Sequence, residues 1–204
     1  MTNDNIPASL HQPYIASFMG LSPKIDPSVF IAATAAVIGA VRIDKNSSIW
    51  HQVTVRGDNN YITIGEGTNI QDNSCIHIDS IKFPTIIGNF VTIGHSAIIH
   101  ACTIGDYGFI GMGAIVMDGA TVESTGMLAA GAMLTAGKTI PAGELWAGRP
   151  AKKMRDLTPA ELLFNQRSAH HYIEVARAHR LGEDGAPFDA MHYRPLPPRA
   201  DKPE

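Results

Sequence analysis

The sequence predicts an all-β solenoid, a left-handed parallel β-helix of six-residue repeats with one C-terminal α-helix. The first observation is periodicity: from Ile31 to Trp146 an aliphatic residue recurs about every sixth position, with register breaks after Val55, Ile76 and Ile99. In such solenoids each hexad forms a short strand and a corner, and three hexads close one triangular coil. The hexads also contain Gly, Asn and Asp, which accept the dihedral angles of tight corners. A capped helical segment follows the last repeat.

We expect an N-terminal arm over residues 1–24 and the β-helix over residues 25–150. The apolar side chains of the arm are expected to pack across the end of the solenoid; they are Tyr14, Phe18, Met19 and Leu21. The repeated position is expected to fill the interior of the coils, with these residues: Ile31, Val37, Ile43, Ile49, Val55, Ile64, Ile70, Ile76, Ile87, Ile93, Ile99, Ile104, Ile110, Val116, Val122, Leu128, Leu134, Ile140 and Trp146.

The helix is expected over residues 157–181. Thr158 has the character of an N-cap, Pro159 suits the first helical position, and Glu161 completes a capping box. Gly182 would end the helix, and the polar, proline-rich segment 182–204 is expected to be a disordered tail.

The amino-acid composition argues against nucleic acids and membranes as partners of this chain. The chain has 204 residues, 45% of them hydrophobic and 17% charged, which is ample for one core. Its 16 Lys and Arg against 19 Asp and Glu provide no basic field of the kind that binds nucleic acids or anionic membranes. No apolar run could span a membrane, and the first residues lack a secretory signal, so we expect a cytoplasmic protein. Cys75 and Cys102 occupy different hexad offsets, so we expect reduced thiols.

A stacked pair of histidines is the sharpest functional signal. When the hexads are grouped in threes, Arg56, His77 and His100 take the second position of successive hexads on one face. The two histidines are 23 residues apart, which is one 18-residue coil plus the five extra residues of a register break. Adjacent coils stack at roughly 4.8 Å. Two imidazoles at that separation can bind one metal ion.

His95 is the candidate third ligand. It belongs to a hexad on another face of the coil that carries His100, so it cannot easily reach that column within one chain. In a closed ring of three subunits, however, this face would lie against the His77 and His100 face of the next subunit. We therefore expect a homotrimer in which the third ligand comes from the neighbouring subunit.

Other polar residues on these faces have simpler interpretations. Polar side chains on a solenoid face are mostly solvated, and no metal role is assigned to the remaining histidines, which are His11, His51, His170, His171, His179 and His192. Arg56 and Asp58 are expected to form an ion pair that orders the seam between subunits. Gln71 should also face the seam, where it could orient a nucleophile or serve as a structural amide.

These residues resemble a known family. The pattern resembles that of the γ-class carbonic anhydrases from about Pro13 to Arg180, on Arg56-Gly57-Asp58, Gln71-Asp72, His77, Gly94-His95 and His100. The resemblance implies a trimer with interfacial metal sites and a C-terminal helix packed along the solenoid. It implies metal ligation by His77, His95 and His100. It also implies interface roles for Arg56, Asp58 and Asp72, and catalytic roles for Gln71 and for Tyr172 on the helix.

Two departures from the prototype enzyme bear on activity. The prototype has a long acidic loop after its first ligand, with a glutamate that shuttles protons. Here the loop from Asp79 to Pro84 is short, and Ser80 stands in place of that glutamate. Asn59 likewise follows Asp58 where the prototype has a second glutamate. We therefore expect hydration to be slow, or the site to serve another reaction.

The resemblance implies reversible hydration of carbon dioxide to bicarbonate by a metal-bound hydroxide. Three neutral imidazoles hold a metal that lowers the pKa of its water to about 7. Zinc is the expected metal, and iron or cobalt would fit the same ligands. Two alternatives stay open: an acyltransferase or thioesterase that acts on acyl-coenzyme A, and a non-catalytic assembly module whose metal only staples the trimer.

Overall fold

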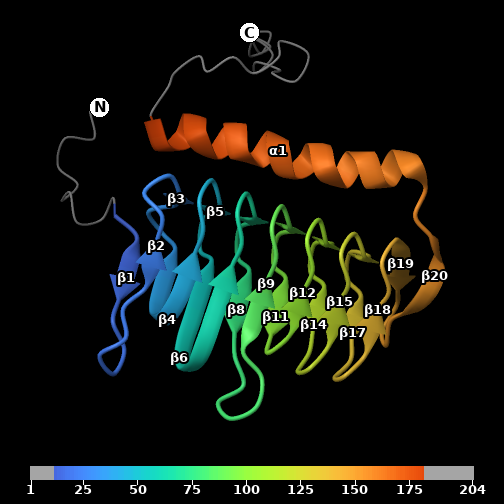
Figure 1. The fold of residues 1–204 in the computed structure, drawn as a ribbon, viewed down its shortest axis with the longest axis horizontal. Helices are drawn as coiled ribbons and strands as arrows, with labels where there is room; N and C mark the ends of the chain where they lie inside the picture. The colour runs from blue at the N-terminus through green and yellow to red at the C-terminus, as the bar shows by residue number, and fades with distance from the viewer. Residues whose placement is uncertain (1–11, 182–204) are drawn as a thin grey trace, which may run out of the picture.

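The computed structural model describes residues 12–181, and within them the predicted β-helix with one C-terminal helix is confirmed (Figure 1). The elements are β1 (Tyr14–Ala16), β2 (Lys24–Ile25), β3 (Phe30–Ile31), β4 (Ala36–Ile43), β5 (Ser48–Ile49), β6 (Thr54–Ile64), β7 (Asn69–Ile70), β8 (Cys75–His77), β9 (Thr85–Ile87), β10 (Thr92–Ile93), β11 (Ile98–His100), β12 (Thr103–Ile104), β13 (Phe109–Ile110), β14 (Ile115–Val116), β15 (Thr121–Val122), β16 (Met127–Leu128), β17 (Met133–Leu134), β18 (Thr139–Ile140), β19 (Glu144–Ala147), β20 (Lys152–Asp156) and α1 (Pro159–Leu181).

Three faces are formed by two sheets, whose strands pair in parallel along the solenoid, while β20 pairs antiparallel with β19 at its end. One sheet has 12 strands and folds over two faces, because the first part of β6 pairs with β8 and its last part pairs with β9. The other sheet has eight strands and forms the third face, on which β7, β10, β13 and β16 lie side by side. The stacking is in register from coil to coil: Ile70 pairs with Ile93, Ile93 with Ile110, and Ile110 with Leu128.

The interior is the predicted aliphatic row. Every predicted position from Val37 to Ile140 is buried, and only Ile31 and Trp146, at the two ends, are partly exposed. Full burial of an aliphatic side chain contributes about 1.5–3 kcal/mol. The repeat therefore builds one continuous core that fixes the backbone of each coil, and with it the direction of the outward side chains.

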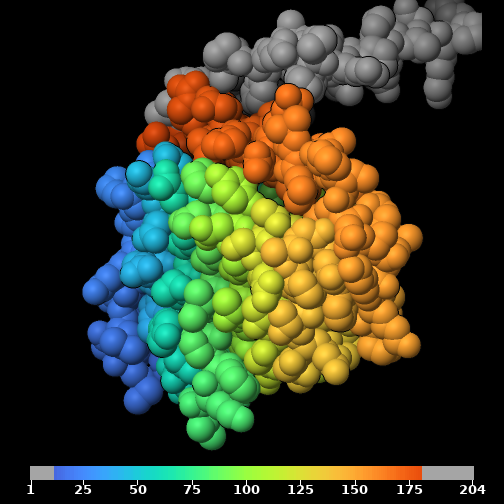
Figure 2. Space-filling model, turned by 45° about the vertical axis from the view of Figure 1, so that its right-hand side comes forward, coloured from blue at the N-terminus to red at the C-terminus, as the bar shows by residue number. Residues whose placement is uncertain are grey.

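The first two register breaks of the hexad repeat are insertions in the solenoid. β6 accommodates the first break as extra residues between Gly57 and Ile62, opposite the shorter path of β4 from Gly39 to Val41. The second break is the loop between β8 and β9, which protrudes from one edge of the solenoid (Figures 1 and 2). Both insertions lie next to the predicted histidine column.

The C-terminal helix has the predicted cap. Thr158 N donates to Glu161 Oε2 at 2.9 Å, and Glu161 N donates to Thr158 Oγ1 at 3.3 Å. The helix lies on the edge of the solenoid opposite the protruding loop (Figures 1 and 2). It packs along the eight-stranded sheet, where Trp50 lies 5.8 Å from the ring of Tyr172 and 5.2 Å from that of His179.

The N-terminal arm differs from the prediction. β1 pairs in parallel with β4, so the sheet begins at Tyr14, inside the predicted arm. A strand of three residues is too short to show a hexad period, so the repeat did not predict it. The four apolar side chains are not packed across the end, since they are exposed: Tyr14, Phe18, Met19 and Leu21. Residues 1–11 of the arm and the predicted tail 182–204 lie outside the described residues.

Two further sequence expectations can be compared with the structure. Cys75 and Cys102 are both free; Cys75 is exposed and Cys102 is buried. Within residues 12–181 no helix is both long and apolar enough to cross a membrane. The expected cytoplasmic location stays a prediction.

Candidate metal centre

The predicted histidine column exists. β8 and β11 lie side by side, and His77 is paired in register with His100. Their imidazoles converge, with His77 Nδ1 3.2 Å from His100 Nε2. The rings are tilted by 51° with centroids 5.2 Å apart. The hexad repeat thus brings together two side chains that are 23 residues apart.

Each of these histidines also contacts an aspartate through its other ring nitrogen. His77 Nε2 lies 3.1 Å from Asp58 Oδ1, and His100 Nδ1 lies 2.5 Å from Asp118 Oδ1. An ionised carboxylate can only accept a hydrogen bond, so each of these nitrogens must carry the proton. In the neutral form of each imidazole, the lone pair is then left on the nitrogen that faces the other ring.

The predicted ion pair between Arg56 and Asp58 forms within the chain. Burial raises the pKa of Asp58, but the hydrogen bond from His77 and the charge of Arg56 outweigh it, so the pKa lies below its usual value. The pKa of His77 is lowered by burial, which outweighs the opposing effect of the bond to Asp58. His77 is therefore neutral at pH 7, as a metal ligand must be.

His95 lies apart from this pair, as the hexad assignment predicted. It follows β10 in the eight-stranded sheet, whereas β8 and β11 belong to the 12-stranded sheet. Its Nδ1 is 2.9 Å from Asp72 Oδ2, so it too has an aspartate partner. Within residues 12–181 of one chain, no group of three or more His, Cys, Asp or Glu side chains is arranged to hold a metal ion.

Gln71 and Tyr172 lie on the His95 side of the chain. Gln71 is buried and donates through Nε2 to Asn69 Oδ1 at 3.1 Å, which is the structural use of this amide. Tyr172 is half-buried on α1; burial and the charge of Asp72 raise the pKa of its hydroxyl, so it stays protonated at neutral pH. The catalytic roles of both residues stay predictions.

Sequence reasoning missed Asp118. Asp118 lies 18 residues after His100, whereas the register of this coil is 17 residues, so the repeat alone did not point to it. The contact between Asp58 and His77 was missed as well, since Asp58 was assigned only to the ion pair with Arg56. His77 is also anchored through its backbone, because Thr85 Oγ1 donates to its carbonyl oxygen.

The donor set fits a metal such as zinc. Two nitrogens bound to one tetrahedral Zn²⁺ at about 2.05 Å are about 3.3 Å apart, and the nitrogens of His77 and His100 are separated by 3.2 Å. Two lone pairs that face each other at this distance repel unless a cation or an additional proton lies between them. A third neutral imidazole, such as His95 of another subunit, would complete the set of protein ligands typical of a catalytic zinc.

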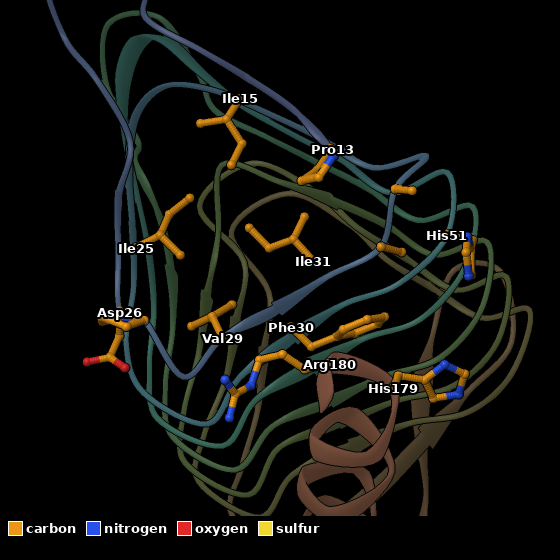
Figure 3. A pocket seen from close by; sticks show the side chains of 13 residues that line it. Pro13, Ile15, Ile25, Asp26, Val29, Phe30, Ile31, His51, His179 and Arg180 are labelled. Atoms are coloured by element: carbon orange, nitrogen blue, oxygen red, sulfur yellow. The ribbon is translucent and has the colours of Figure 1, made fainter. Parts of the chain in front are cut away.

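One cavity of the described residues lies away from the histidine column. It has a volume of about 610 Å³ and opens at the first coil, with a floor of Ile25, Phe30 and Ile31 and a rim that includes His179 and Arg180 from α1 (Figure 3). None of the predicted site residues lines it. The side chains of His77, His95 and His100 are partly exposed in the single chain.

Comparison with known proteins agrees with this geometry. The chain is 48% identical over 175 residues to gamma carbonic anhydrase 2 of Arabidopsis thaliana, a match that covers 83% of the chain and 63% of that mitochondrial protein. It is 39% identical over 166 residues to the carbonic anhydrase of Geobacillus kaustophilus, which covers 81% of the chain and 91% of that protein.

Among solved structures, a hexapeptide transferase family protein from Anaplasma phagocytophilum is 52% identical. It superposes with a TM-score of 0.79 and covers 81% of this chain and 98% of its own. No family model matches the chain. The identity and coverage of the bacterial and plant relatives, together with the hexad fold and the histidine column, show that this chain belongs to the γ-class carbonic anhydrase family.

Proposed function

We propose that the chain catalyses the reversible hydration of carbon dioxide to bicarbonate at zinc sites shared between the subunits of a homotrimer. Iron or cobalt would suit the same ligands. The observation that carries the proposal is the convergence of His77 Nδ1 and His100 Nε2 at 3.2 Å, with the opposite nitrogen of each ring held by an aspartate. The names and activities of the relatives support it.

The trimer is supported by the surface beside the histidines. On the same face, the row of outward side chains next to the column consists largely of apolar residues paired in register: Thr54, Cys75, Ile98, Ile115 and Met133. Ile98 is 44% exposed and Met117, which follows His100 in the column, is 37% exposed. A contiguous apolar strip on an outer face is typical of an interface. A ring would cover this strip and bring His95 of one subunit to His77 and His100 of the next.

The chemistry can be assigned to residues. Zinc held by three imidazoles lowers the pKa of a water molecule to about 7 and thereby supplies a nucleophile at neutral pH. The aspartates would hold each imidazole in the orientation that aims its free nitrogen at the metal. Gln71 would orient the nucleophile through its amide, and Tyr172 would contribute its protonated hydroxyl from the helix.

Proton release is the step that we expect to slow hydration. In the loop between β8 and β9, Asp79 Oδ1 accepts hydrogen bonds from the backbone of Ile81 and Lys82, so its carboxylate is engaged in holding the turn. Ser80 provides no carboxylate. The proton must therefore leave through water or through a group not yet identified, which predicts slower hydration than an enzyme with an acidic shuttle would give.

Acyl transfer to or from coenzyme A is the second candidate. The 52%-identical solved structure is described as a hexapeptide transferase family protein, and a thioesterase could use the same histidines. The third candidate is a non-catalytic trimer in which the metal only holds the subunits together. Assays of acetyl-coenzyme A consumption and of metal-dependent assembly separate these candidates from carbon dioxide hydration.

The first experiment measures metal per subunit by elemental analysis, mass in solution, and carbon dioxide hydration by stopped flow on the zinc-loaded protein. We expect about one metal per chain in a trimer, with hydration that is lost in His100→Ala. His51→Ala is the matched control, because His51 is an exposed histidine outside the column whose Nδ1 lies 3.1 Å from the hydroxyl oxygen of Thr34. A metal-free trimer that turns over acetyl-coenzyme A would refute the proposal.

A further inference from the structure

We propose that Asp118 is a positioning residue for His100: its carboxylate holds the Nδ1–H of the imidazole and thereby aims the Nε2 lone pair at the metal. The inference rests on the proposed metal site. The contact that carries it is the 2.5 Å separation of His100 Nδ1 and Asp118 Oδ1.

The tautomer follows from the partners of the ring. His100 has an aspartate oxygen on Nδ1 and the ring of His77 on Nε2. Since the carboxylate accepts only, the proton lies on Nδ1 and the lone pair lies on Nε2, where the ring of His77 also points. Histidine ligands of metals commonly donate their other N–H to a carboxylate, which fixes the ring and raises the basicity of the ligand.

Asp118 departs from the pattern of its own position in the repeat. The third position of the hexads on this face is otherwise occupied by residues without charge, and the set is Gly39, Gly57, Ile78, Ala101, Asp118 and Ala136. Asp118 lies in the coil that follows His100, and its carboxylate reaches back to that ring.

The backbone around Asp118 is held firmly. Gly119 N donates to Ala101 O at 2.7 Å, and Gly137 N donates to Asp118 O at 2.9 Å, so the corner is tied to the coils on both sides. Gly119 has φ +65°, and a Cβ there would lie 3.1 Å from the ring of Phe83. The loop between β8 and β9 therefore packs over the corner and restricts where the short aspartate side chain can point.

The test compares Asp118→Ala with Asp44→Ala. Asp44 is a matched control, since its side chain is 43% exposed against 44% for Asp118, and it has a contact of its own, the ion pair with Arg42 at 3.4 Å. We expect Asp118→Ala to bind Zn²⁺ about 10- to 100-fold more weakly in competition with a chromogenic chelator, and to alter the visible spectrum of the Co²⁺-loaded protein. Asp118→Asn, which keeps an acceptor oxygen, should lose less affinity. Zinc affinity equal to that of Asp44→Ala would overturn the proposal.

A second readout needs no metal. The ring ¹⁵N shifts of His100 in the metal-free protein, assigned by their loss in His100→Ala, report which nitrogen carries the proton. We expect the Nδ1–H tautomer in the wild type and a shift toward Nε2–H in Asp118→Ala. An unchanged tautomer in Asp118→Ala would overturn the positioning role. If the wild type binds no zinc and yet the tautomer responds, the proposed function fails and the positioning of His100 by Asp118 stands.

Discussion

Substitution of two neighbouring isoleucines in β11 tests how the coil separates its interior from its interface. Ile99 is fully buried, and Ile98 is 44% exposed on the outer face. Ile99→Ala removes three carbon groups, which costs about 2.4 kcal/mol in transfer free energy at about 0.8 kcal/mol each. The cavity adds to this, because Ile76 and Val116 are held in register on either side and cannot close the gap. We expect a loss of about 3–4 kcal/mol in the free energy of unfolding, within the range of about 2–5 kcal/mol for such changes.

Ile98→Ala is the control in the same strand. About half of this side chain is already exposed in the single chain, so its removal should cost about 1.3 kcal/mol of intrachain burial. Its main effect should be on assembly, because Ile98 belongs to the apolar row beside the histidines. The assays are urea unfolding at one protomer concentration and a sedimentation dilution series. The reasoning is refuted if Ile99→Ala costs less than about 1 kcal/mol, or if Ile98→Ala leaves the dissociation of the trimer unchanged.

Three further predictions concern ionisable groups. Asp58→Ala removes the partner of Arg56 and His77, and we expect the trimer to dissociate at higher protein concentration, whereas an unchanged sedimentation profile would count against a seam role. The ion pair with Arg155 and the cap bonds lower the pKa of Glu161 to about 2 from 4.5, so its stabilising effect is complete above about pH 4.5 and disappears as the pH falls toward 2. The thermal midpoints of the wild type and Glu161→Gln should therefore differ at pH 7 and converge by pH 2, and a gap independent of pH would contradict this. Burial raises the pKa of the Cys102 thiol far above its usual value, so alkylation at pH 8 should spare Cys102 until the protein unfolds; rapid native labelling would show that this coil opens.

The histidine column could be predicted because a hexad repeat converts offsets in sequence into positions in space. Once Ile76 and Ile99 are assigned to the interior, the next residue of each strand must point outward on the same face. The structure confirms that inference in the register pair of His77 and His100. The helix cap could be predicted for a similar reason, since Thr158 and Glu161 act within one turn of chain.

The aspartate contacts could not be read from the repeat alone. Asp58 lies in the insertion of β6 and Asp118 at a corner, where the side chain reaches diagonally to another coil and its direction depends on local backbone angles. The hydrogen bond from Gln71 to Asn69 was equally hidden, because it depends on a buried polar ladder in which Asn69 also donates to Thr92. The repeat period determines where a residue lies in the coil, whereas the backbone angles at the corner determine the direction of its side chain.

Subunit mixing tests the interfacial metal site most directly. His95→Ala and His100→Ala should each bind almost no metal as pure proteins, because every site in either trimer lacks one ligand. In trimers assembled at random from equal amounts of the two chains, a site is complete wherever a His95→Ala subunit offers His77 and His100 to the His95 of a His100→Ala neighbour. Elemental analysis of the mixed trimers should therefore recover about one quarter of the wild-type metal content. Mixed trimers that stay as empty as the pure variants would contradict the shared site.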